Sequence, residues 1–279
     1  MKKTTYSTNV VTTHMWHRPL SGSAALAYAA AVLLLWSCIT VVLMAVDTRL
    51  FQGVSVWSKP WKFQISTSVF LWTLAYFMAF LPEAKRRGAA AQYIVWGSLV
   101  ATAFEIPYIT WQAALAQASH FNVSSTLYGL LYNAMAAGAL ALTSAALLVG
   151  VLIFKHCKQT LTNAMRHAIA WGLISSFVLG SFTGMYVGSK RLTGHWVGGI
   201  ASDAGGWLFF NWSRTGGDLR VAHFFSLHAM QGLPVIALLL ARSQMTDTAQ
   251  TRWVWLATVA YAAWCVWTFV QAVQGVPFM

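Results

Sequence analysis

Glu105 is the residue of this sequence whose chemistry stands out, because it is a carboxylate inside an apolar stretch. Burying a carboxylate in a transmembrane helix costs about 2.5 to 3.5 kcal/mol on insertion scales, so such a group usually faces a cavity or a partner. Tyr108 and Gln112 follow at helical spacing and share its face. Pro107 removes a backbone donor between them. The pattern predicts a functional polar stripe, and the alternative is a glutamic acid that clamps two helices together.

His228 lies at a similar depth in another apolar stretch, eight residues beyond Arg220, which is about 12 Å of helix. Gln231 is close to it on the same helical face. Glu105 and His228 would then form an acid–imidazole pair, which can orient a histidine ligand or relay a proton. The simpler alternative is a helix–helix hydrogen bond worth under about 2 kcal/mol.

A second group of polar residues is expected nearer the membrane surface. Its members are His120, Asn122, His195, Asp218 and His223. His223 and His228 are five residues apart, so one regular helix cannot direct both at a single small ion, and any ligand must be shared between helices. Imidazoles from two helices are the usual way in which a bundle holds haem b. Three imidazoles with an aspartate suit zinc or copper, and hydrated surface residues are the alternative.

These considerations assign a role to each candidate. The predicted catalytic residues are Glu105, His228 and Asp218; the predicted haem ligands are drawn from His120, His223 and His228; and the predicted zinc or copper ligands are His120, His195 and His223. Supporting roles are expected for Lys62, Tyr108, Gln112, Gln231 and Asn122. Lys62 opens an apolar stretch, where it either reaches the lipid headgroups, neutralises a carboxylate or receives an anion.

The amino-acid composition indicates the class of protein that must position these residues. Of the 279 residues, 9% are charged and 58% are hydrophobic, and the mean hydropathy is +0.58. Soluble proteins carry about 25% charged residues, so this chain cannot cover a soluble surface and its solvent is a lipid bilayer. The net charge of +12 does not indicate a nucleic-acid partner, because the basic residues stand at the ends of apolar runs rather than on one face.

Seven apolar stretches are long enough to be transmembrane helices. They cover residues 22–46, 61–81, 89–115, 126–154, 167–187, 221–241 and 253–274. The sequence therefore predicts an all-α integral membrane protein, with a cytoplasmic segment at 1–20 and a single seven-helix domain at 21–279.

Basic residues in short connections predict the orientation. The amino end and the connections at 82–88, 155–166 and 242–252 hold 11 of the 18 basic residues, with only Glu83 and Asp247 as acids. These segments should face the cytoplasm, which places the carboxyl terminus outside. We expect the membrane to be a bacterial inner (plasma) membrane.

Residues 188–220 form an unusually long connection between the fifth and sixth stretches, with eight glycines and five tryptophans and phenylalanines. Long loops in compact folds are usually functional or disordered. The aromatic residues favour an ordered extracytoplasmic lid over the bundle, and the alternative is a loop that its aromatic residues merely anchor among headgroups.

The favoured function is a haem- or metal-binding membrane oxidoreductase or electron-transfer protein, with a quinone or a lipid as a possible substrate. Two alternatives are a zinc-dependent hydrolase or lipid-modifying enzyme and a proton-coupled transporter. A purely structural polar layer is a further reading. The sequence contains no Walker A, G-x-G-x-x-G, G-x-S-x-G or C-x-x-C-H motif that would decide among them.

Overall fold

The computed structural model describes residues 18–190, 193–207 and 209–278, and most of these residues are helical. The long helices in this part of the chain are α2 (Arg18–Val46), α3 (Ser58–Met78), α5 (Ala89–Ala114), α6 (Thr126–His156), α7 (Asn163–Ser189), α8 (Leu219–Leu240) and α9 (Asp247–Val273). A short helix, α4 (Glu83–Arg86), lies between α3 and α5. Two antiparallel strand pairs join β1 (Leu50–Phe51) to β2 (Val54–Ser55) and β3 (Trp196–Val197) to β4 (Gly217–Asp218).

Six of the described helices, namely α2, α5, α6, α7, α8 and α9, are long and apolar enough to cross a membrane. The fold is therefore that of a multi-pass helical membrane protein, as the composition predicts. Each of the seven expected stretches overlaps one of the long helices, with ends displaced by a few residues. The expected second span corresponds to α3, which is not among the six and carries Lys59, Lys62 and Gln64 in its first two turns.

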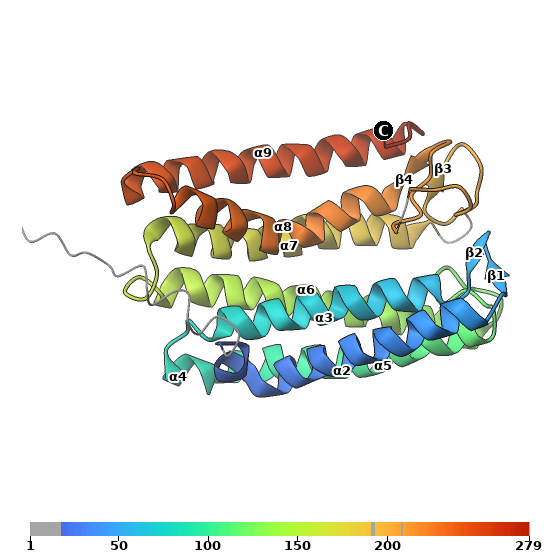
Figure 1. The fold of residues 1–279 in the computed structure, drawn as a ribbon, viewed down its shortest axis with the longest axis horizontal. Coiled ribbons are helices and arrows are strands. Elements are labelled where there is room, and N and C mark those ends of the chain that lie inside the picture. Colours follow the sequence, from blue (N-terminus) through green and yellow to red (C-terminus); the bar gives the residue numbers. More distant parts are fainter. Residues whose placement is uncertain (1–17, 191–192, 208, 279) are drawn as a thin grey trace, which may run out of the picture.

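The long helices lie side by side along one axis in two groups (Figure 1). The first half of the bundle consists of α2, α3, α5 and α6, and the second half of α7, α8 and α9; α6 packs against α7 where the halves meet. The strands and the C-terminus gather at one end, which we call the lid end, whereas α4 lies at the opposite end (Figure 1). This arrangement brings the connections at 47–57, 115–125 and 188–220 together.

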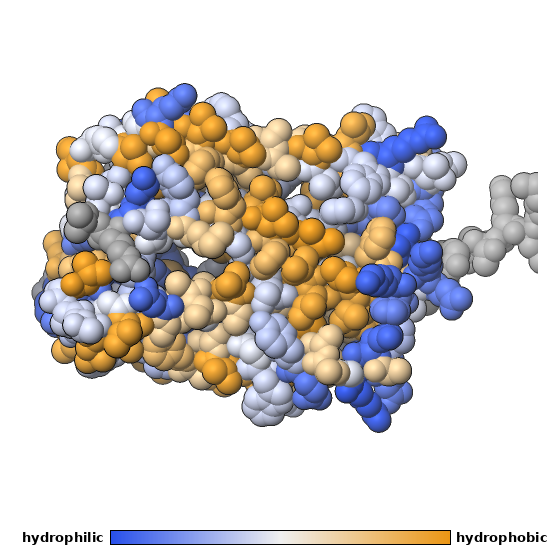
Figure 2. Space-filling view, turned by 180° about the vertical axis from the view of Figure 1, so that it is seen from behind, coloured by the Kyte–Doolittle hydropathy of each residue, from blue (hydrophilic) through white to orange (hydrophobic). Residues whose placement is uncertain are grey.

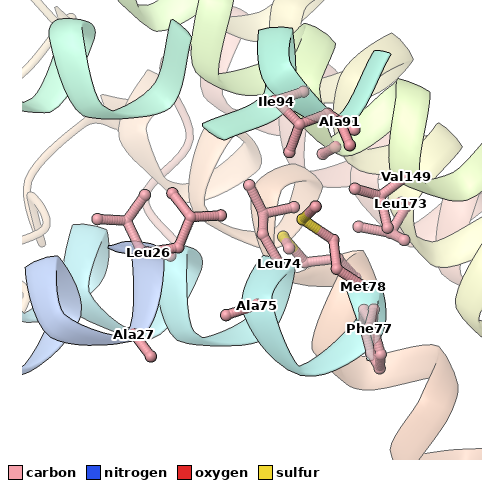
Figure 3. Close-up of a cluster of buried hydrophobic side chains, with 14 of the residues drawn as sticks. Leu26, Ala27, Leu74, Ala75, Phe77, Met78, Ala91, Ile94, Val149 and Leu173 are labelled. Atoms are coloured by element: carbon pink, nitrogen blue, oxygen red, sulfur yellow. The ribbon is translucent and has the colours of Figure 1, made fainter. Parts of the chain in front are cut away.

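A large apolar cluster fills the core of the first half farther from the lid end. Leu74 and Met78 of α3 pack with Ile94 of α5 and Val149 of α6, and these side chains present only carbon and sulfur to one another (Figure 3). Leu173 of α7 belongs to the same cluster and links it to the second half. Close packing of this kind leaves few voids larger than a water molecule.

The face of the bundle shown in Figure 2 is largely hydrophobic in its middle, and its hydrophilic side chains are densest at the end away from the lid. Exposed side chains such as Leu35, Trp96, Val100 and Leu256 contribute to this apolar surface. An apolar surface this extensive is unusual for a soluble monomer and fits contact with lipid tails. Figure 2 also shows a hollow between the two halves, on the lid side of the middle.

Gly172 of α7 allows the closest approach between α7 and α8. A Cβ atom at this position would lie 2.7 Å from the carbonyl oxygen of Ala229, which is backbone and cannot turn away. We therefore expect Gly172→Ala to destabilise the protein by about 1 to 3 kcal/mol, measured as a lower thermal-unfolding midpoint in detergent.

Gly129→Ala is the matched control for this substitution. Gly129 is also helical, and an added Cβ would meet no atom within 4 Å, so alanine should leave stability unchanged or raise it by about 0.5 to 1 kcal/mol. Equal midpoints for the two variants would contradict the packing described for α7 and α8.

Candidate site at the lid end

The described residues within 188–220, a segment which we call the lid, lie at the end of the bundle and bond to both of its halves. The backbone N–H of Asp203 donates to the carbonyl of Gln52 in the β1–β2 turn, at 2.9 Å. Trp207 Nε1 donates to the carbonyl of Phe278 near the C-terminus, also at 2.9 Å. These bonds attach the lid to the protein itself, so its described residues are more than a membrane anchor.

Arg220 fastens the lid through two carboxylates. Its Nη2 lies 2.8 Å from Asp203 Oδ1 and 2.6 Å from Asp218 Oδ2. Asp218 also accepts from the backbone N–H of Ser213 at 2.9 Å, and its side chain is fully buried. Both oxygens of Asp218 are thus engaged in holding the lid and the start of α8. The structure therefore places this expected catalytic residue in the network that fastens the lid.

His195 joins the same network, because its Nε2 donates to Asp203 Oδ1 at 3.3 Å. Burial lowers the pKa of His195, and the hydrogen bond to Asp203 opposes this effect only in part. Burial by itself would raise the pKa of Asp203, but the bond from His195 and the charge of Arg220 outweigh it, so the pKa of Asp203 is lowered. Near neutral pH the lid therefore holds a neutral imidazole and an ionised carboxylate.

A threonine of α7 positions His223 of α8. Its Nδ1 lies 3.1 Å from Thr183 Oγ1, and the same hydroxyl lies 2.8 Å from the carbonyl of Leu179. A hydroxyl that donates to this carbonyl can accept from Nδ1–H of His223, and that tautomer has its lone pair on Nε2. The imidazole also lies against Gly184, where a Cβ atom would come within 2.9 Å of Cε1.

His228 is oriented in the same way, one and a half turns deeper in α8. Its Nδ1 donates to Gln231 Oε1 at 3.3 Å, and Gln231 Nε2 donates to Thr73 Oγ1 of α3 at 3.1 Å. The side-chain hydrogen bonds of His223 and His228 are made at Nδ1. Both imidazoles therefore keep the nitrogen that binds a metal or a haem iron free.

His120 comes from the connection between α5 and α6 and contacts the first half of the bundle. Its ring centroid lies 5.4 Å from that of Phe63 in α3 and 6.1 Å from that of Tyr132 in α6, and its Nδ1 lies 3.2 Å from Ser119 Oγ. Burial lowers the pKa of His120 well below its usual value, and Lys59, His223 and His195 act on it in the same direction. These groups are close enough to interact, so imidazoles from both halves gather at the lid end.

The expected pairing of Glu105 with His228 is not formed. Glu105 Oε1 contacts Gly138 of α6, where a Cβ atom would collide with it, whereas His228 bonds to Gln231 and through it to Thr73 of α3. The sequence places the two residues at equal depth, but the polar face of α8 that carries His228 and Gln231 contacts α3. Tyr108 and Gln112 are buried on α5 beside Glu105, as the helical spacing predicts.

Lys62 binds the lid rather than a carboxylate of the bundle. Its Nζ donates to Asn211 Oδ1 at 2.7 Å and to the carbonyl of Phe210 at 3.1 Å. Asn122 makes only local bonds, donating to the carbonyl of Ala118 and accepting from Ser124.

The three-ligand zinc or copper set of His120, His195 and His223 is not assembled. In the described part of the chain no group of three His, Cys, Asp or Glu side chains could hold a metal ion. One reason is that His195 uses its Nε2 to bond Asp203.

Several residues of the site were missed by sequence reasoning. Arg220 has no predicted role in the site, although two aspartates in the same glycine-rich segment, Asp203 and Asp218, are a usable signal for one. Thr183 and Ser119 carried no signal, because a hydroxyl in a helix or turn is informative only once its partner in space is known.

Comparisons with known proteins add no assignment: no protein-family model, no curated protein and no solved structure matches this chain.

Asp203→Asn should loosen the lid, because it replaces a charged acceptor of Arg220 and His195 with a neutral one. We expect tryptic cleavage after the exposed Arg214 to become about tenfold faster. Asp47→Asn, which changes a carboxylate at the same end that pairs with Arg49 instead, should leave cleavage after Arg214 unchanged. Equal rates in the wild type and Asp203→Asn would show that this network does not hold the lid.

Acidification should loosen the lid in two phases. His195 has a lowered pKa in the folded protein, so its contribution is present above its ordinary value of 6.5 and declines below it. Asp203 also has a lowered pKa, so its contribution declines only below its ordinary value of 3.8. Amide exchange of residues 193–207, corrected for intrinsic rates, should show both phases, and His195→Gln should remove the first. A first phase that persists in His195→Gln would contradict this assignment.

Proposed function

We propose that this protein binds haem b between the two halves of the bundle, near the lid end, with His120 and His223 as axial ligands, and that it transfers electrons within the membrane. The observation that carries the proposal is the pair of oriented imidazoles: they come from opposite halves, and each has a side-chain hydroxyl at its Nδ1. Ligation through Nε2 with the other nitrogen bonded to the protein is the usual arrangement of metal-bound histidine.

The surroundings of the two imidazoles support a haem in particular. Two axial nitrogens are sufficient to hold a haem iron in a helical bundle, so a third ligand is not needed. The aromatic rings of Phe63 and Tyr132 line the His120 side, and Gly184 leaves the His223 side without a Cβ. Lys59 lies near His120 and is available to pair with a haem propionate.

The topology that we infer has α3 crossing the membrane with the six more apolar helices, which places the two termini on opposite sides. The basic residues opposite the lid end then face the cytoplasm by the positive-inside rule. In a bacterial inner membrane the lid and the haem would lie near the outer surface, and a membrane quinone is the class of electron partner that fits this depth.

The two alternative functions have less support. A zinc hydrolase needs three protein ligands and a water, and no such ligand group occurs among the described residues. A proton-coupled transporter needs a polar path across the whole membrane, and between α3, α5 and α6 the core away from the lid end is filled by an apolar cluster (Figure 3).

The proposal predicts that the purified full-length protein has a Soret band and reduced α-band of bis-imidazole haem, with about one haem per chain. His223→Ala and His120→Ala should each lower the haem content by about tenfold or more. His156→Ala, an exposed histidine at the opposite end, is the matched control and should keep the full content.

A further variant serves as the experimental control for correct folding. His120→Met retains a possible iron ligand, so it should keep haem with a shifted spectrum and a raised potential. A folded wild-type protein that stays colourless, both from haem-replete cells and after addition of haemin, would contradict the proposal.

A further inference from the structure

A continuous stripe of buried polar side chains runs along one face of α5 inside the first half of the bundle. Its members are Ser98, Thr102, Glu105, Tyr108 and Gln112, and none is more than 7% exposed. Each of them carries at least one buried oxygen or nitrogen atom that has no hydrogen-bond partner among the described residues. The stripe extends over about 21 Å of helix.

Gln64 of α3 adds to the stripe from the opposite wall. Its Oε1 accepts from Thr40 of α2 at 2.8 Å, whereas its Nε2 has no partner in the described structure. Native proteins leave few buried polar atoms unsatisfied, and ordered water usually bonds those that lack a protein partner. The unpartnered atoms on this helix face therefore need partners that the described side chains do not supply, and water is the usual one.

The lid end of α5 has room for the first of these molecules. A cavity of about 20 Å³ is lined by Lys59, Ile109, Ala113, Gln117 and Ser119, among others, and a space of roughly 10 to 15 Å³ is enough for one water. The lining mixes a lysine, an amide and a hydroxyl with apolar groups, so a water there has polar partners. This cavity adjoins the turn of α5 that carries Gln112.

The stripe is closed at its other end. Beyond Ser98, the same face of α5 continues with Ile94 and Ala91, which pack against Leu74 and Met78 of α3 (Figure 3). A polar row that begins near the lid end and stops in mid-membrane serves the exchange of small polar species with one side only.

We propose that this stripe is a hydrated half-channel that carries protons between the lid end and the carboxyl group of Glu105. Glu105 has no cationic partner in the described residues and stands about 14 Å into the helix from the lid end, so it resides there as the neutral acid. The carboxyl group gives its proton to the adjacent water and takes another from it, which leaves the net charge unchanged. This inference does not depend on the haem proposal.

Infrared spectroscopy of the full-length protein in lipid nanodiscs tests the half-channel directly. The protonated carboxyl group of Glu105 should give a C=O stretching band that disappears in Glu105→Gln. On transfer to D₂O this band should shift within seconds in the wild type. Gln112→Leu removes a polar partner between Glu105 and the lid end and should slow the shift by about tenfold or more.

Two further variants keep the test decisive. Tyr108→Phe deletes a single hydroxyl from the stripe and should also slow exchange, even if Gln112→Leu fails to fold. Gln92→Leu changes an exposed glutamine of the same helix and should exchange as the wild type does. The half-channel is refuted if the wild-type band is absent, if it does not shift over hours, or if Tyr108→Phe exchanges at the wild-type rate.

Discussion

Every polar group that enters a bundle surrounded by lipid must find its partner inside the protein, because the hydrocarbon offers none. This constraint explains why the polar side chains of this chain are concentrated toward one end. Thr40, Gln64 and Gln112 are fully buried in the first half near the lid end, whereas a large cluster of apolar side chains fills the first half farther from the lid. The apolar core holds the helices together, and the polar region leaves room for chemistry.

The lid depends on the same constraint. Its turns carry acceptor groups that need partners, and Arg220 donates to the carboxylates of Asp203 and Asp218 and to the carbonyl of Asn211. Lys62 reaches Asn211 from the first half while Arg220 reaches it from the second. One short segment of the lid thus joins the two halves at the end of the bundle that holds the imidazoles we assign to a haem. A loosened lid would expose that region to water, so the lid and the proposed site form one unit.

The fold could be predicted from the sequence because long apolar stretches leave little choice but helices in lipid. The polar stripe of Tyr108 and Gln112 beside Glu105 was predictable for the same reason, since helical spacing defines a face. What spacing cannot supply is the direction in which that face points. Equal depth predicts a pairing of Glu105 with His228, and this prediction fails. The carboxyl group of Glu105 packs against Gly138 of α6, whereas His228 is connected to α3 by Gln231.

The orientation of the imidazoles could not be read from the sequence either, since it depends on hydroxyl groups distant along the chain. Thr183 is 40 residues from His223, yet its hydroxyl is the group that lies at Nδ1 of that ring. The tautomer of His223 that has its lone pair on Nε2 is the basis of the proposed haem site.

Electron paramagnetic resonance of the oxidised, purified protein tests this proposed site most directly, because the signal of ferric haem reports its axial ligands. The account predicts a low-spin ferric signal typical of two imidazole ligands in the wild type, replaced by a high-spin signal or lost in His223→Ala. A protein that is folded and loaded with haem but gives the same signal after His223→Ala would contradict it.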